Sequence, residues 1–178
     1  DNTKTQYTGA IPVSSTTTIK AIAYATGYDP SAVASATYTI NVAPTITVTE
    51  ATLPAFSTTA GSSQDQNITV SGTNLTGDIT LALSGTDAAL FSLSENSITP
   101  TSGTVTDKVI TITYAPTAPG THTAKLTLSS PGATAVERDL TGTATLAKPT
   151  ITGASNIGKT ALTLNWNAVT GATEYEVN

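Results

Sequence analysis

Alternation of polar and apolar residues with a period of two is the feature that most constrains this chain. The stretch VITITYAP shows it over residues 109–116, where Ile110, Ile112 and Tyr114 alternate with Val109, Thr111 and Thr113. THTAKLTLSS repeats the pattern over residues 121–130. Because successive side chains of a strand point to opposite faces of a sheet, this pattern predicts half-buried β-strands and conflicts with the 3.6-residue period of a helix.

The composition supports strands along most of the chain. Thr accounts for about 40 of the 178 residues, whereas Leu, Ala and Gly lead the ranking in typical soluble proteins. Charged residues make up 11%, well below the usual share of about 25%. Thr is β-branched and fits a pleated, half-exposed surface. A surface of Thr and Ser therefore favours an all-β fold.

The middle of the chain has strand patterns at the 8–12-residue spacing of a β-sandwich. We expect strands near residues 45–49, 66–71, 79–84, 91–93, 108–114, 121–129 and 135–143. The segments APTAPG and SSPGATA separate the last three as Pro/Gly turns, and GTDAAL suggests a single helical turn. We predict a seven-strand sandwich over roughly residues 44–146. Its expected core consists of Ile68, Val70, Leu81, Phe91, Ile110, Ile112, Leu126 and Leu128.

Pro44 and Pro149 each precede a new strand pattern and mark two junctions. They divide the chain into three modules: 1–42, 43–147 and 148–178. In the first, strand patterns over 18–25 and 32–42 flank TGYDPS, which is typical of a hairpin turn.

The two end modules are much smaller than the roughly 100 residues of an immunoglobulin-type sandwich. We therefore expect tandem immunoglobulin-like domains of which the terminal ones are incomplete, as in a piece of a longer chain. A partial domain leaves its core half covered. The residues expected to be more exposed than their patterns demand, or covered by a neighbouring chain, are Ile19, Ile22, Val33, Leu162, Leu164 and Trp166.

Three resemblances agree with this division. The stretch from YTGAIPV through TTTIKAIAY to SATYTI, within residues 7–40, resembles the second half of a chitobiase/β-hexosaminidase C-terminal-type domain. QNITVSGTNLTGDITLAL, FSLSENSITPTSGTV, ITITYAPTAPGTHTAKLTLSS and LTGTAT resemble a hydin-type immunoglobulin-like domain. WNAVTGATEYEV resembles the start of a fibronectin type III domain, with Trp166 as its core Trp and Tyr175 as the Tyr of the following strand. The resemblances imply non-catalytic modules of a large secreted or cell-surface bacterial protein that handles polysaccharide or mediates adhesion.

Several function classes are disfavoured by the residues themselves. Nucleic-acid binding needs clustered Lys and Arg, and this chain has 7 scattered ones and a net charge of −5. Its apolar runs are too short for a membrane span. There are no cysteines for disulfides or thiolate metal ligands. The one histidine, His122, is expected to be an outward strand residue, since no nucleophile and orienting carboxylate accompany it.

We predict no catalytic residues, no metal site and no cofactor. A loop Ca²⁺ site stays open as an alternative, because Asp65, Asp78, Asp87, Glu95 and Asp107 are expected in loops, although they form no D-x-D-x-D-G array.

Two function classes remain. The first is a structural spacer whose partners are other domains of the same longer chain and which positions a distal functional domain. The second is a glycan- or protein-binding (adhesion) module. For the second class the candidate contact residues are Tyr28, in the hairpin turn, and Tyr24 beside it. The short Pro-containing junctions favour the spacer, since they leave no long flexible linker. The expected setting is extracellular or at the cell surface.

Overall fold

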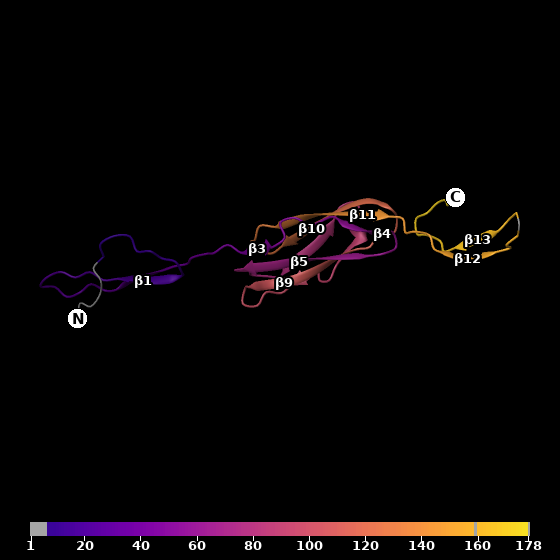
Figure 1. The fold of residues 1–178 in the computed structure, drawn as a ribbon. Helices are drawn as coiled ribbons and strands as arrows, with labels where there is room; N and C mark the ends of the chain where they lie inside the picture. Colours follow the sequence, from indigo (N-terminus) through magenta and orange to yellow (C-terminus); the bar gives the residue numbers. More distant parts are fainter. Residues whose placement is uncertain (1–6, 159, 178) are drawn as a thin grey trace. The chain divides into compact units, whose positions relative to one another are not determined.

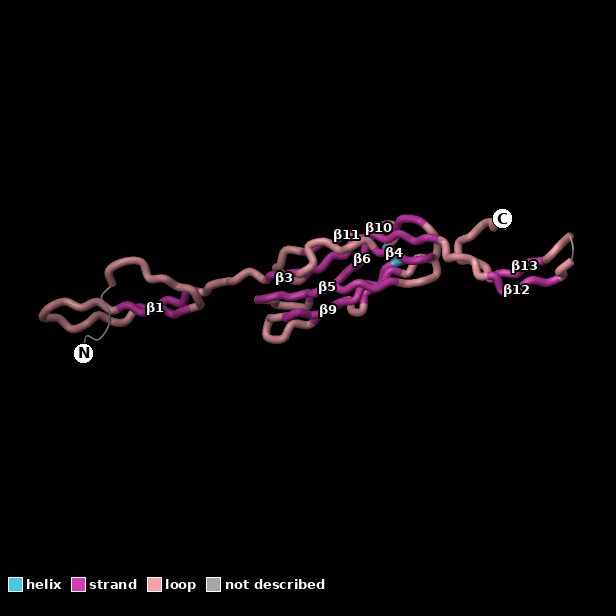
Figure 2. The backbone as a smooth tube through the Cα atoms, in the orientation of Figure 1, coloured by secondary structure: helices cyan, strands magenta, loops and turns pink. Residues whose placement is uncertain are grey.

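The computed structural model describes residues 7–158 and 160–177, and it is almost entirely β (Figures 1 and 2). The chain divides into two compact units, residues 1–42 and 43–178. The elements are β1 (Thr17–Ala21), β2 (Ala34–Tyr38), β3 (Thr45–Val48), β4 (Phe56–Thr59), β5 (Gln64–Thr73), β6 (Ile79–Ser84), the 3₁₀ turn η1 (Ala88–Leu90), β7 (Phe91–Leu93), β8 (Ser97–Ile98), β9 (Val105–Tyr114), β10 (Gly120–Ser129), β11 (Val136–Thr145), β12 (Ile151–Ser155) and β13 (Thr163–Trp166).

The first unit is built on the antiparallel hairpin β1–β2, with Thr17 opposite Tyr38 and Ala21 opposite Ala34. The connection between the strands is closed by the Ser31 N–H, which donates to the Ala23 carbonyl at 3.0 Å. Gly27 has φ +83°, a value that favours glycine. The predicted hairpin is therefore present, with strands shorter than the sequence pattern indicated.

Two sheets form a sandwich in the second unit. One sheet has the order β3-β5-β9-β7 and the other β4-β11-β10-β6-β8. All seven predicted strands are present, and GTDAAL contains the single turn η1. Sequence reasoning missed β4 and β8, because four and two residues are too few to show a period of two. The fold is thus an all-β, immunoglobulin-like sandwich.

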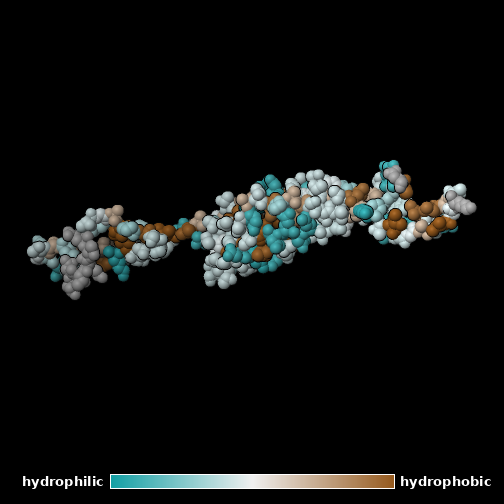
Figure 3. Space-filling view, in the orientation of Figure 1, coloured by the Kyte–Doolittle hydropathy of each residue, from teal (hydrophilic) through white to brown (hydrophobic). Residues whose placement is uncertain are grey.

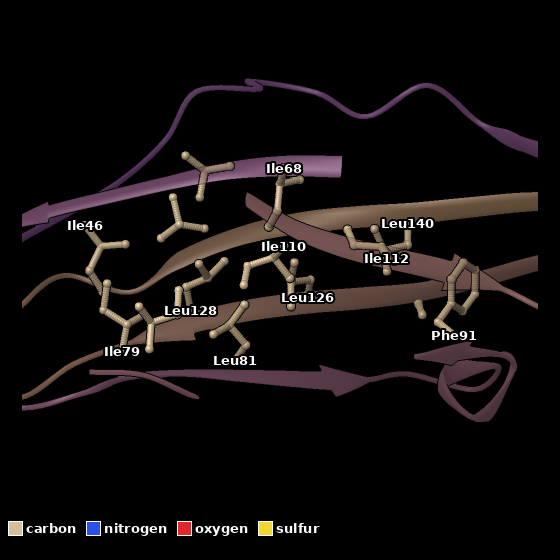
Figure 4. Close-up of a cluster of buried hydrophobic side chains, with 14 of the residues drawn as sticks. Ile46, Ile68, Ile79, Leu81, Phe91, Ile110, Ile112, Leu126, Leu128 and Leu140 are labelled. Atoms are coloured by element: carbon tan, nitrogen blue, oxygen red, sulfur yellow. The ribbon is translucent and has the colours of Figure 1, made fainter. Parts of the chain in front are cut away.

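The sandwich core lies between the two sheets (Figure 4). All eight residues predicted for it are buried, and six of them have no exposed surface. The alternation of side chains along each strand explains which residues are buried. On β9 the isoleucines at 110 and 112 point inward, while Val109 is 52% exposed on the other face. Burying one such side chain fully contributes about 1.5–3 kcal/mol, so this core accounts for most of what holds the sheets together.

Aromatic rings fill one end of the core. Phe91 stacks on Tyr114 with a centroid separation of 4.9 Å, and Phe56 packs edge-on against Phe91 at 5.7 Å. The fully buried Tyr114 hydroxyl shares a hydrogen bond with His122 Nδ1 at 2.6 Å. The expectation of an outward His122 is therefore wrong. His122 has the same parity on β10 as the buried Ala124 and faces the Tyr114 ring, which gives its imidazole a structural partner.

The last described segment carries the two-stranded sheet β12–β13, in which Ala154 lies opposite Leu164. Its strands have no fully buried residue. None of the six apolar residues expected to be exposed is buried: Ile22, Val33 and Leu162 are exposed and Ile19, Leu164 and Trp166 are half-buried. Hydrophobic surface is visible over the segment that precedes the sandwich in the chain and over the segment that follows it (Figure 3). The described part of the chain holds no helix long and apolar enough to span a bilayer.

Candidate functional site

The two tyrosines singled out from the sequence lie in or beside the β1–β2 connection. Tyr28 is 81% exposed and Tyr24 is 55% exposed. The Tyr28 N–H donates to the Ala25 carbonyl at 3.2 Å, which places Tyr28 in the turn beside Gly27. An exposed phenol ring offers a flat apolar face and a polar tip. Tyr28 is thus available to a ligand, whereas the ring–ring contacts found in the described residues all lie elsewhere.

A second aromatic surface, which the sequence analysis did not propose as a site, lies on the segment that carries β12 and β13. The rings of Trp166 and Tyr175 are 5.4 Å apart, and the Val169 N–H donates to the Tyr175 hydroxyl at 2.6 Å. These rings line an open groove of about 250 Å³ together with Pro149, Ile151, Leu164, Glu176 and Val177. A tryptophan half-exposed in an apolar groove resembles a domain core that lacks part of its cover.

A second hollow, of about 300 Å³, lies beside Arg138 and is bounded by residues 51–53, residues 137–139 and Thr141. Arg138 is already engaged there. Its Nε donates to the Glu50 carbonyl at 2.7 Å and its Nη2 to the Val48 carbonyl at 3.2 Å. Because these bonds use the guanidinium on the protein's own backbone, the residue ties the end of β3 to β11 and does not present a free anion-binding fork.

The Glu50 carboxylate beside this hollow is also engaged. The Thr69 backbone N–H donates to it at 2.8 Å and the Thr69 hydroxyl at 3.2 Å. The backbone bond from Thr69 is the main cause that holds the Glu50 pKa below its usual range, and the charge of Arg138 acts in the same direction. The carboxylate is therefore a structural acceptor, ionised at neutral pH.

Polar side chains on the outer face of the β5–β9 pair bond to one another across the strands. Asp65 accepts from the Thr113 hydroxyl at 2.6 Å, and Asn67 accepts from the Thr111 hydroxyl at 2.9 Å. Ser71 donates to Asp107 at 3.0 Å. Pairs of this kind are the sheet counterpart of helix i, i+4 contacts. These bonds engage the side-chain oxygens of this face with one another.

The acidic residues considered for Ca²⁺ are dispersed in the structure. Asp65 and Asp107 lie in β5 and β9, so the expectation that they are loop residues is wrong. Asp65 accepts a hydrogen bond from the Thr113 hydroxyl and Asp107 accepts one from the Ser71 hydroxyl, so both carboxylates are engaged on the β5–β9 pair. Within residues 7–158 and 160–177, no three His, Cys, Asp or Glu side chains gather in a way that could hold a metal ion. His122 Nδ1 is engaged with the Tyr114 hydroxyl at 2.6 Å.

Comparison with known proteins gives one family match and remote structural similarity. The model of the family described as "Fn3 associated" matches residues 1–38. No curated protein matches the chain. A Bacteroides ovatus GH5 xyloglucanase, solved with a XXXG heptasaccharide, aligns at 15% identity and a TM-score of 0.42 over 56% of this chain. The chain spans 19% of the length of that enzyme.

The ASH/PapD-like domain 7 of human CEP192 aligns at 15% identity and a TM-score of 0.40, over 58% of this chain and 87% of that domain. Similarity at this level carries no inference about activity. The comparisons therefore relate the N-terminal unit to Fn3-associated modules.

Proposed function

We propose that this chain is a set of non-catalytic structural modules that hold a functional domain at a distance in a secreted or cell-surface bacterial protein. The observation that carries the proposal is the closed surface of the sandwich. Its core is buried between the two sheets, and the polar side chains on the outer face of the β5–β9 pair are hydrogen-bonded to each other. A surface of this kind supports stability and hydration without a binding cleft. The short Pro-containing junctions at Pro44 and Pro149 support stiff connections to neighbouring modules.

The finer assignment follows the resemblances. Residues 1–42 are proposed to be part of a chitobiase C-terminal-type domain, 43–147 a hydin-type domain and 148–178 part of a fibronectin type III domain. Exposed apolar residues support the two partial assignments, since Val33 in the first segment is 58% exposed and Leu162 in the last segment is 55% exposed. Further β-structure of the same longer chain is proposed to cover them.

The spacer role is tested by measuring how stiffly the modules are joined. The chain lacks cysteine, so Ser35→Cys on β2 and Thr143→Cys on β11 introduce two unique and exposed spin-label sites. Double electron–electron resonance is expected to give one narrow distribution of distances between the two spin labels. A broad distribution would show a flexible tether and contradict the spacer. Assays with polysaccharide, ester and phosphodiester substrates are expected to show no turnover, and turnover abolished by substituting one acidic residue would overturn the proposal.

A glycan-binding role is the second candidate, and the 81% exposure of Tyr28 in a turn favours it. Sugar rings stack on exposed aromatic faces through their apolar C–H surfaces. A glycan array probed with the whole chain tests this role, with Tyr28→Ala and Tyr24→Ala as loss variants. Tyr38→Ala is the matched control, because Tyr38 is 54% exposed but lies opposite Thr17 at the other end of the hairpin. Equal binding by all three variants would exclude the turn as the site.

A further inference from the structure

The first and last segments of the sandwich run side by side in the same direction. Strand β4 pairs with β11 in parallel, with Phe56 opposite Gly142 and Thr59 opposite Thr145. The contact continues beyond the strands, since the Ala60 N–H donates to the Thr145 carbonyl at 2.9 Å. The chain therefore enters and leaves the sandwich through two adjacent segments.

The parallel alignment of the two segments extends back to the point where the chain enters the sandwich. Pro44, just before β3, lies against Gly132 in the turn before β11, with the proline Cγ 3.4 Å from where a glycine Cβ would stand. Further along, the carbonyls of Val48 and Glu50 accept from Arg138. Residues 44–60 thus follow residues 132–145 from one end of the sandwich to the other, although β3 itself belongs to the opposite sheet.

This arrangement determines how a pulling force acts. Tension on the N-terminal side pulls β3 and β4 backwards along their axis. Tension on the C-terminal side pulls β11 forwards along the same axis. Because the two segments are parallel, the forces are opposed and lie along the strands, so the bonds between the segments are sheared together. In a peeling geometry the same bonds would break one after another.

Arg138 gives this pair of segments a second connection. Its guanidinium is held by its own strand β11 and binds two carbonyls at the end of β3, so it links the first strand to the last strand across the two sheets. Bonds from a charged donor are about twice as strong as neutral ones. Tension on the entry strand is therefore transmitted to the exit strand through these bonds, in addition to the backbone pairing of β3 with β5.

We propose that the sandwich resists mechanical tension, because β3 and β4, β11 and Arg138 form a shear clamp against extension through the two ends of the chain. The biological use of the clamp rests on the proposed spacer function, because a spacer in a surface protein transmits tension. The clamp itself is a property of the fold and is measurable without that role.

Single-molecule force spectroscopy on the whole chain tests the clamp by changing only the direction of pulling. One tether joins the two termini. The other joins the amino terminus to Thr134→Cys, which lies in the exposed turn near Pro44 and so places both attachment points at one end of the sandwich. Unfolding between the termini releases about 100 residues and lengthens the chain by roughly 30 nm, which identifies the event. The rupture force is expected to be at least about twofold higher between the termini, since forced unfolding follows the barrier along the pulled direction. Equal forces in the two geometries would overturn the proposal.

The contribution of Arg138 is tested with Arg138→Met, which keeps the aliphatic stem and removes the donors. Lys108→Met is the matched control: Lys108 pairs with Glu95 at 2.5 Å on the β9 side, outside the loaded segments. Between the termini, Arg138→Met is expected to raise the unfolding rate at constant force by about tenfold, the effect of losing one or two charged bonds. In the Thr134 geometry the change is expected to be much smaller. An equal effect in both geometries, or an equal effect of Lys108→Met, would refute the role of Arg138 in the clamp.

These results separate the clamp from the spacer. A chain that gives a broad label-distance distribution but a strong dependence on pulling direction lacks the spacer function and retains the clamp. A chain with a narrow distribution and no dependence on direction is a spacer without a clamp.

Discussion

Gly142 is the position where one added methyl group has the clearest consequence. On β11 it lies directly over the Tyr114 ring: a Cβ there would stand 2.6 Å from Cζ and 2.8 Å from Cε1 and Cε2. Favourable carbon contacts are about 3.5–4.0 Å, so the ring or the strand has to shift by about 1 Å. The Gly142→Ala variant therefore tests how firmly the aromatic end of the core is held.

The Tyr114 ring has little freedom to move. It has no exposed surface, stacks on Phe91 at 4.9 Å, packs against Phe56 at 5.7 Å and is anchored by its hydroxyl at His122. Overpacking in a closed core typically costs about 1–3 kcal/mol, and the close approach to three ring atoms argues for about 2 kcal/mol or more. For a domain of about 100 residues, this loss lowers Tm by roughly 8–15 °C.

Urea and thermal unfolding followed by far-UV circular dichroism measure the effect. Gly77→Ala is the control within the same sandwich, because its Cβ would meet only the edge of the Pro131 ring at 3.2 Å. We expect it to change stability by less than about 1 kcal/mol. In Tyr114→Leu the ring is absent, so adding Gly142→Ala to that background is expected to cost clearly less than in the parent chain. Wild-type stability of Gly142→Ala, or strictly additive losses in the double variant, would refute the reasoning.

Three other perturbations have defined outcomes. The Glu50 pKa is lowered in the fold, so its stabilisation is present at neutral pH and is lost as the pH falls through the folded pKa. Glu50→Gln is therefore expected to flatten the loss of stability in acid unfolding below about pH 4.5, by under about 1 kcal/mol for this half-buried, solvent-screened group. Burial raises the Tyr114 pKa, so the free energy of unfolding is expected to fall as the pH rises above about 10. Tyr114→Phe is expected to lose about 1 kcal/mol of stability at pH 7 and to lack that alkaline loss. Parallel curves of stability against pH for the two proteins would contradict this prediction. Trp166 is half-buried, and its fluorescence is expected to be quenched readily by acrylamide; a protected, blue-shifted emission would show that its groove is covered in solution.

The strands of the sandwich could be predicted because each long one shows a period of two over enough residues. Ile110, Ile112 and Leu126 are buried as that alternation requires, since one face of each sheet packs on the other. The exposed position of Tyr28 in a turn could also be predicted, because Gly27 and Pro30 mark a turn and turns lie at the surface. Whether Tyr28 contacts a ligand is a separate question that local sequence does not address.

The contacts that give this protein its particular properties were decided by tertiary structure. His122 has the parity of an inward residue, but only the assembled sheets place a tyrosine hydroxyl within its reach. The Gly142–Tyr114 contact, the Arg138 bonds to β3 and the parallel pairing of β4 with β11 join residues 28 to 90 positions apart. Local propensity and periodicity report on which face a side chain occupies over a few neighbours. They carry no information on which distant strand lies beside it, because that choice depends on how the two whole sheets bury their apolar faces against each other.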